Sequence, residues 1–124
     1  MDKTLNKKTG NEGEDIAAVY LKGKGYKILE RNLRLFCGEI DILASPPAGG
    51  RRTIVLVEVK TVRGEGFGSA QELVRFKKQN KLRTLGKALE QEYPGRTIRI
   101  DVIGVDFSSG EARIEHLVNA VEGN

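Results

Sequence analysis

Residues 38–60 decide the fold, and they read GEIDILASPPAGGRRTIVLVEVK. Glu39 to Ala44 alternates between polar and apolar side chains, and Thr53 to Val62 is rich in β-branched residues, as strands are. The segment between them contains two prolines and two glycines, which favour a reversal of the chain. We therefore predict an antiparallel hairpin. If it turns at Gly49 and Gly50, residues whose numbers sum to 99 face each other.

This register gathers acidic and basic side chains on neighbouring strands. Asp41 is expected opposite Glu58, and Glu39 opposite Lys60. Side chains two residues apart on a strand share a face, so Glu58 and Lys60 should project together. Two opposed carboxylates repel each other unless a cation lies between them. The hairpin therefore predicts a cation site.

An oxygen site of this kind suits Mg²⁺ or Mn²⁺, which retain several waters and bind phosphate oxygens. Asp41 and Glu58 are the predicted metal ligands, and Lys60 is expected to orient a water or to stabilise a transition state. The alternative is a surface ion-pair ladder of little consequence. We favour the catalytic interpretation because Ile40 and Ile42, expected on one buried face, make the strand that carries Asp41 an internal one.

The surrounding sequence predicts two helices and three further strands. A T-x-x-E capping box at Thr9 to Glu12 starts a helix near residues 9–11. The expected elements are a helix to about residue 22, a strand over 26–35, a helix over about 70–92, a strand over 97–107 and a short strand over 112–117. The three successive strands form a meander, and the order αβββαββ predicts an α/β fold with a mixed central sheet of about five strands and a helix on each face.

Size and composition limit the classes of function. With 124 residues, residues 1–124 are expected to form a single domain, with residues 1–8 as a flexible basic tail. Cys37 and His116 are the only cysteine and histidine, which excludes an internal disulfide, a cysteine-rich zinc site and a multi-histidine metal site. No apolar stretch approaches the roughly 20 residues of a membrane-spanning helix, and we expect a cytoplasmic protein without a membrane partner.

Positive charge is concentrated in one part of the chain. The net charge is +4, and residues 75–87 contain six basic and no acidic residues. Such a run suits phosphate contact, and Lys77, Lys78 and Lys81 are the candidate nucleic-acid-binding residues. A solvated helix face explains the same run about equally well. Asp101, which follows Arg99 on the fourth strand, is expected to form a structural ion pair there or to lie near the metal.

A set of motifs spread over nearly the whole chain resembles the YraN-like family of uncharacterised bacterial proteins. The motifs are Gly13-Glu14, Ala17, Tyr20-Leu21, Gly25-Tyr26, Arg31-Asn32, Gly38-Glu39-Ile40-Asp41 and Val57-Glu58-Val59-Lys60. That family is similar to the restriction-endonuclease-like superfamily, whose PD-(D/E)xK signature is matched by Asp41, Glu58 and Lys60. Ile40 stands where the signature has proline.

The resemblance implies a restriction-endonuclease-like fold and a fourth site residue. In the Holliday-junction-resolvase branch of the superfamily a glutamate on the first helix joins the site, and Glu14 is the matching position. An acid stabilised by the helix dipole explains Glu14 about equally well.

Three functions are open at this point. The first is a metal-dependent endonuclease that hydrolyses phosphodiester bonds in DNA, with branched DNA as one candidate substrate. The second is a nucleic-acid-binding module that keeps the fold but does not cleave, and the third is a protein without a nucleic-acid partner in which the charges merely pair. A nuclease that makes paired cuts would require a homodimer.

Overall fold

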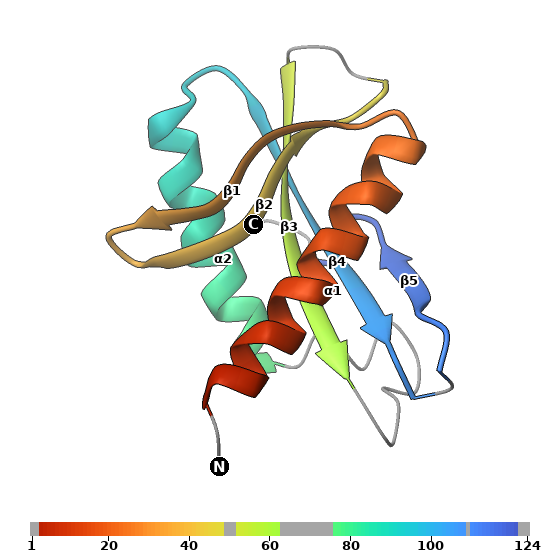
Figure 1. Ribbon diagram of the computed structural model, residues 1–124. Coiled ribbons are helices and arrows are strands. Elements are labelled where there is room, and N and C mark those ends of the chain that lie inside the picture. The colour runs from red at the N-terminus through yellow and green to blue at the C-terminus, as the bar shows by residue number, and fades with distance from the viewer. Residues whose placement is uncertain (1–2, 49–51, 63–75, 109, 122–124) are drawn as a thin grey trace.

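A computed structural model describes residues 3–48, 52–62, 76–108 and 110–121, and the side chains of residues 3–10, 62 and 76–78 lie outside the description. The elements are α1 (Lys3–Gly23), β1 (Lys27–Leu35), β2 (Gly38–Ser45), β3 (Thr53–Val62), α2 (Phe76–Glu92), β4 (Thr97–Asp106) and β5 (Arg113–Leu117) (Figure 1). Their order confirms the predicted αβββαββ arrangement.

The strands form one mixed sheet in the order β1-β2-β3-β4-β5. β1, β2 and β3 are antiparallel neighbours, as predicted for the meander, and β5 is antiparallel to β4. β3 and β4 are parallel, so the chain must cross over between them, and the segment containing α2 makes this crossover.

Each face of the sheet is covered by one helix, which confirms the predicted layers (Figure 1). On one face, Ala17, Ala18 and Leu21 of α1 pack against a buried cluster: Ile42, Ala44, Val55, Val57, Ile103 and Val105. On the other face, the buried side chains of α2 pack against alternating residues of the same strands: Leu82, Leu85 and Leu89 against Ile40, Leu43, Ile54, Leu56, Ile100 and Val102. The continuous apolar runs of β3 and β4 follow from burial on both faces.

The prediction that Ile40 and Ile42 share one face is wrong. Ile40 packs in the cluster beneath α2, whereas Ile42 packs in the cluster beneath α1. The register of β1 against β2 shifts between Ile28 and Glu30, and such a bulge increases local twist. Figure 1 shows the two strands curving together toward α2, and the side chains of β2 change faces between the two isoleucines.

Element ends differ from the predictions mainly in α1. The helix begins at Lys3 and not near residues 9–11, so the expected flexible tail of residues 1–8 overlaps it. No proline or strand-forming run precedes Thr9, and a capping box does not prevent a helix from extending upstream of it. β4 and β5 each differ from the prediction by one residue, and the predicted start of α2 lies outside the described residues.

α1 lies very close to β3 at Gly13. A Cβ at this position would collide with the hydroxyl of Thr61 and would lie 3.2 Å from the Thr61 Cβ. Only glycine allows this approach, which is why a poor helix former is present in the helix. The contact fixes the helix near the C-terminal end of β3, so that the next residue, Glu14, is held there as well.

A buried ion-pair network joins β4, β5 and the C-terminal end of α1. The Asp101 side chain is fully buried and accepts hydrogen bonds from Arg99 Nε and Nη2 at 2.9 and 2.8 Å, and from the Asn119 amide at 3.0 Å. His116 Nε2 lies 2.7 Å from Asp101 Oδ2, and its Nδ1 lies 3.1 Å from the Tyr20 hydroxyl. The expected ion pair of Asp101 with Arg99 is therefore confirmed. The network ties the edge strand and the helix to the sheet.

Neither helix in the described ranges combines the length and the hydropathy that crossing a membrane requires.

Asp101→Asn is expected to lower the free energy of unfolding at pH 7 by on the order of 3 kcal/mol, because it leaves Arg99 without its anion in a buried network. Burial raises the pKa of Asp101, but hydrogen bonds from His116, Arg99 and Asn119 outweigh burial and hold the pKa below its usual value. The unfolded chain therefore binds a proton at Asp101 more readily than the folded chain does. The stabilisation by ionised Asp101 is complete above about pH 4 and is lost as the pH falls through the folded-state pKa.

Urea denaturation at several pH values measures both effects. Glu39→Gln is the matched control, because Glu39 and its partner Arg34 are both exposed, so this variant should lose less stability. Equal losses in the two variants would show that the network does not hold the sheet edge.

Candidate active site

The candidate site lies where β2 separates from β3. The two strands pair from Ile42↔Val57 to Ala44↔Val55, which is the predicted register with residue numbers that sum to 99. One residue beyond this stretch, the Asp41 carboxylate accepts a hydrogen bond from the Val59 amide at 2.8 Å. The Asp41 side chain thus takes the place of the next backbone hydrogen bond between β2 and β3. Asp41 is fixed beside the segment that carries Glu58 and Lys60.

The side chains of Glu58 and Lys60 project from the same face of β3. Val59 packs with the cluster beneath α1, so its neighbours on either side project from the opposite face of the strand. Glu58 is half-buried and Lys60 is exposed. The long parallel pairing of β3 with β4, from Thr53↔Thr97 to Val62↔Asp106, holds both positions on a rigid strand.

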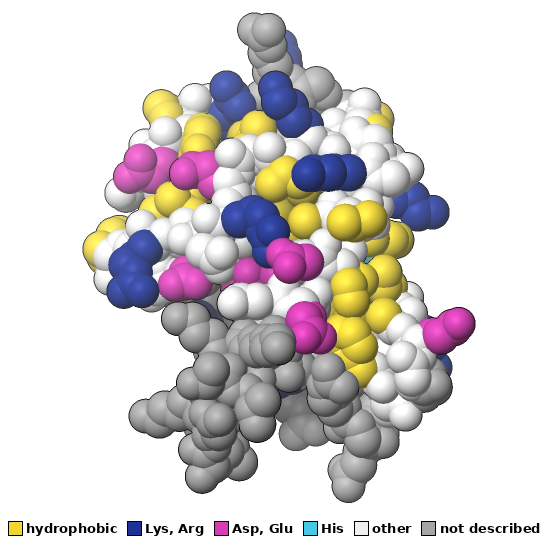
Figure 2. Space-filling model, in the orientation of Figure 1, with side chains coloured by type: hydrophobic (Ala, Val, Ile, Leu, Met, Phe, Trp, Pro, Cys, Tyr) yellow, Lys and Arg dark blue, Asp and Glu magenta, His cyan; other side chains and the backbone are white. Residues whose placement is uncertain are grey.

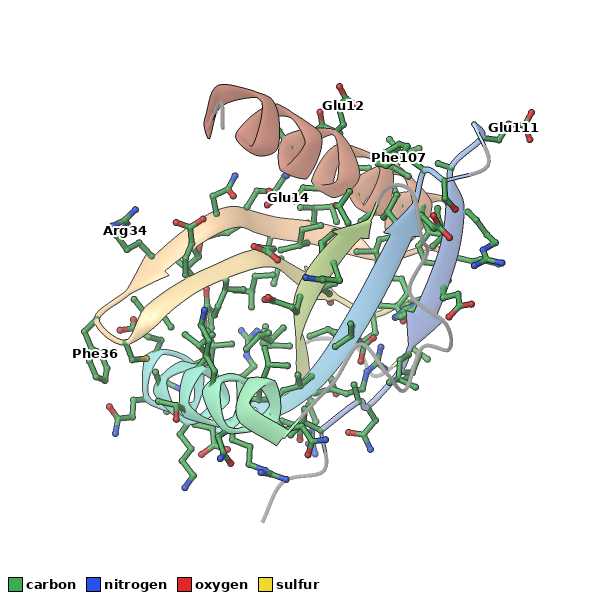
Figure 3. All side chains as sticks on the ribbon, turned by 90° about the horizontal axis from the view of Figure 1, so that it is seen from below. Glu12, Glu14, Arg34, Phe36, Phe107 and Glu111 are labelled. Atoms are coloured by element: carbon green, nitrogen blue, oxygen red, sulfur yellow. The ribbon has the colours of Figure 1, made fainter. Side chains whose placement is uncertain are left out.

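Glu14 reaches this region from α1. Its side chain is 15% exposed, and its Oε1 atom is buried without a hydrogen-bond partner among the described residues. Arg31 Nη2 lies 3.8 Å from that atom, which is an ion-pair distance and too long for a hydrogen bond. Figure 3 shows Glu14 on the side of the helix that faces the β1 and β2 ribbon.

The electrostatics of Glu14 link it to the acidic residues of the strands. Burial raises the pKa of its carboxyl, Arg31 opposes this shift, and the negative charges of Glu39, Asp15 and Glu58 raise the pKa further. Among these charges, that of Glu58 has the smallest effect. A cation placed near the Glu14 and Glu58 carboxylates would relieve this repulsion.

The predicted pair of Glu39 with Lys60 lies beyond the paired stretch of β2 and β3. Glu39 instead contacts its partner on the other neighbouring strand, Arg34, at 3.5 Å. A central strand has two neighbours, and prediction from the β2–β3 hairpin considered only one of them.

Arg31, which is not among the predicted site residues, lies beside Glu14. It lies on β1 and pairs with Asp15 of α1 at 2.7 Å as well as with Glu14. Only the packing of the helix on the sheet brings these residues together, so sequence spacing gave no signal for it.

The candidate nucleic-acid-binding lysines lie on α2. Lys81 is exposed and lies against the turn between β1 and β2, where its Cε would be 3.8 Å from a Cβ at Gly38. Lys77 and Lys78 belong to the first turn of α2, and their side chains lie outside the described part of the chain. Figure 2 shows acidic side chains near the middle of the face crossed by α1, with Lys and Arg side chains beside them.

Among the residues that the structure describes, no three His, Cys, Asp or Glu side chains are gathered closely enough to hold a metal ion. The metal site therefore stays a prediction. Its chemistry remains suitable, because Mg²⁺ is commonly held by one or two carboxylates with water and phosphate oxygens completing its coordination.

The chain is similar to many proteins that carry only a family designation. A UPF0102 protein of Desulforamulus reducens is 40% identical over 120 residues, which cover 93% of this chain and 96% of the relative. A UPF0102 protein of Geotalea uraniireducens is 40% identical over 126 residues, with 98% and 94% covered.

Two solved structures are more distant. One is titled as an EndoMS-dsDNA2 complex, with 18% identity and a TM-score of 0.44 over 68% of this chain and 32% of that chain. The other is Pyrococcus furiosus SfsA in complex with Ca²⁺, with 15% identity and a TM-score of 0.40 over 94% of this chain and 65% of that chain.

The family model matches residues 13–105, a span that runs from the close-contact glycine of α1 to the end of β4 and includes Glu14, Asp41, Glu58 and Lys60. The chain therefore belongs to the uncharacterised protein family UPF0102.

Proposed function

We propose that this protein is a metal-dependent nuclease that hydrolyses phosphodiester bonds in DNA. The proposal is carried by the buried Glu14 oxygen, which has no hydrogen-bond partner among the described residues, together with the Asp41 carboxylate at the point where β2 and β3 separate. The resemblance of Asp41, Glu58 and Lys60 to the PD-(D/E)xK signature supports the same chemistry.

The burial of the Glu14 carboxylate among other acids argues for a functional role. A buried carboxylate oxygen without a donor lowers stability, and the nearby acids add repulsion. Glutamine or an apolar residue would avoid this cost. Proteins that depart from full polar satisfaction usually do so at functional sites. A cation shared with neighbouring carboxylates would remove the cost of both the burial and the repulsion.

In this proposal Asp41 and Glu58 hold Mg²⁺ or Mn²⁺, and Glu14 completes the acidic set. The ion would supply a bound water of lowered pKa and would neutralise charge on the phosphate. The hydrogen bond from the Val59 amide fixes the orientation of the Asp41 carboxylate, which is what precise ligand placement requires. Lys60, exposed beside Glu58, provides a positive charge that orients a water or binds a phosphate oxygen.

The basic residues of α2 fit an anionic polymer as the substrate. Lys81 and Lys87 are exposed, while the leucines between them bury the opposite side of the helix. Contacts of lysine with phosphates release counterions, so binding should weaken as salt concentration rises. A nucleic-acid-binding module that does not cleave would share this surface and this salt dependence, and only cleavage in the presence of a divalent metal separates the two functions.

Asp41→Asn and Glu58→Gln are expected to lower the cleavage rate by at least about 100-fold, because each removes a charge proposed to hold the metal. Lys60→Met should cause a loss of similar size while leaving salt-dependent DNA binding in place. The measurement is the cleavage of duplex, forked and single-stranded DNA with Mg²⁺ or Mn²⁺.

Glu90→Gln is the control for a lost carboxylate, because Glu90 is exposed near the C-terminal end of α2. It should cleave like the wild type. If the wild type cuts none of these substrates, or if all variants cut equally, the nuclease proposal is wrong. DNA binding without cleavage would then favour the non-cleaving module.

The ionisation of Glu14 gives an independent test. Arg31→Met should raise the pKa of Glu14 further, because Arg31 is the cation that lowers it, and Asp15→Asn should reduce the upward shift, because Asp15 raises it. The carboxyl carbon resonance of Glu14, followed by NMR as a function of pH, reports the pKa directly. Shifts in the same direction for both variants would contradict the proposed environment of Glu14.

If Glu14 acts as a carboxylate, activity should fall as the pH decreases through its raised pKa. Glu14→Gln should be at least as stable as the wild type at pH 7, since it removes a buried charge, yet it should cleave more slowly. A loss of both stability and activity would indicate a structural role.

A further inference from the structure

Phe36 is an exposed aromatic residue at the tip of the β1 and β2 ribbon. Its side chain is 91% exposed, and Figure 3 shows it at the far end of the hairpin, pointing away from the body of the protein. The closing pair of the ribbon is Leu35↔Gly38, so Phe36 and Cys37 form the turn itself. The other large hydrophobic side chains that are exposed in the described part of the chain are aliphatic: Val19, Leu29 and Val118.

The turn that carries Phe36 is anchored on α2. Leu35 and Cys37 pack against the cluster beneath α2, whereas Phe36 between them points outward. Gly38 has a φ of +150°, a conformation that favours glycine, and a Cβ there would lie 3.4 Å from Leu85 Cδ2. A fixed turn with an exposed ring loses little conformational entropy when the ring is covered by a partner.

Positive charges accompany the ring. The Arg34 side chain is 84% exposed on the same ribbon, and Lys81 lies beneath the turn. Glu39 is also present and pairs with Arg34 at 3.5 Å. Exposed aromatic rings beside basic groups are the combination by which proteins bind single-stranded nucleic acid, because bases stack on the ring while phosphates contact the cations.

The ribbon also relates the ring to the candidate active site. Asp41 lies on β2, five residues after Phe36 in the turn, and five extended residues span at most about 17 Å. One strand of nucleic acid advances about 3.4 Å per nucleotide, so this distance corresponds to about five nucleotides.

We propose that Phe36 stacks on an unpaired base about five nucleotides or fewer from the bond that is cut, so that the protein prefers DNA with open base faces over continuous duplex. The inference rests on the nucleic-acid partner of the proposed function and adds the class of substrate to it. A base inside an intact duplex has no free face for the ring, whereas a fork or a single strand offers one.

Tryptophan fluorescence tests the contact directly, because the chain contains no tryptophan. Phe36→Trp introduces a single reporter, and its emission should be quenched when single-stranded or forked DNA is added but not when blunt duplex is added. Val19→Trp, on the exposed side of α1, is the matched control and should show no quenching. Equal quenching in both variants, or none in Phe36→Trp while the protein binds the DNA, would overturn the inference.

Affinity provides the second measurement. Phe36→Ala should weaken binding to forked and single-stranded DNA by about 5- to 150-fold, the loss expected for one base stacked on an aromatic ring, and should leave duplex binding unchanged. If Phe36→Ala binds all DNA as the wild type does, the inference fails and the nuclease proposal stands. Quenching and a loss of affinity without cleavage by the wild type would uphold the contact while the nuclease proposal fails.

Two further results would overturn the inference. If the wild type binds no DNA, both the inference and the proposed function are wrong. If sedimentation shows that the wild type self-associates and Phe36→Ala does not, the ring contacts a second copy of the chain.

Discussion

The hydrogen bond from the Val59 amide to the Asp41 carboxylate is the interaction on which the candidate site depends. It forms where β2 and β3 cease to follow their regular pairing, and it replaces a backbone contact with a contact to an acidic side chain. Strand separation provides room beside Glu58 and Lys60 without leaving the Val59 amide unsatisfied. The bulge in β1 and the curvature of the β1 and β2 ribbon bend β2 away from β3. The same curvature places the turn at Phe36 against α2.

The second constraint is the approach of α1. Gly13 allows the helix to contact Thr61, and this contact holds Glu14 where burial and neighbouring acids raise the pKa of its carboxyl. The Asp101 network holds the C-terminal end of the helix through Tyr20 and His116. The helix is thus fixed at its middle and near its C-terminal end, and a carboxylate that lowers stability is held where its neighbours repel it. Stability supplied by the network offsets the strain that the site introduces.

Much of this fold could be predicted from local patterns. The β-branched run of β3 and the turn residues after β2 gave the hairpin and its register. Predictions failed where tertiary packing decides: Ile40 and Ile42 separate because the ribbon coils, and Arg31 joins Glu14 only because α1 lies across β1. The grouping of Glu14 with Glu58 came from a family resemblance, since spacing in the sequence cannot show that a helix and a strand meet.

The most direct test is the binding of Mn²⁺, measured by electron paramagnetic resonance, to the wild type and to Asp41→Asn, with Glu90→Gln as the control. The account predicts one ion per chain in the wild type and the control, and an affinity at least about tenfold lower in Asp41→Asn. No binding by the wild type, or equal binding by all three proteins, would contradict the claim that separated strands and a buried acid form a metal site.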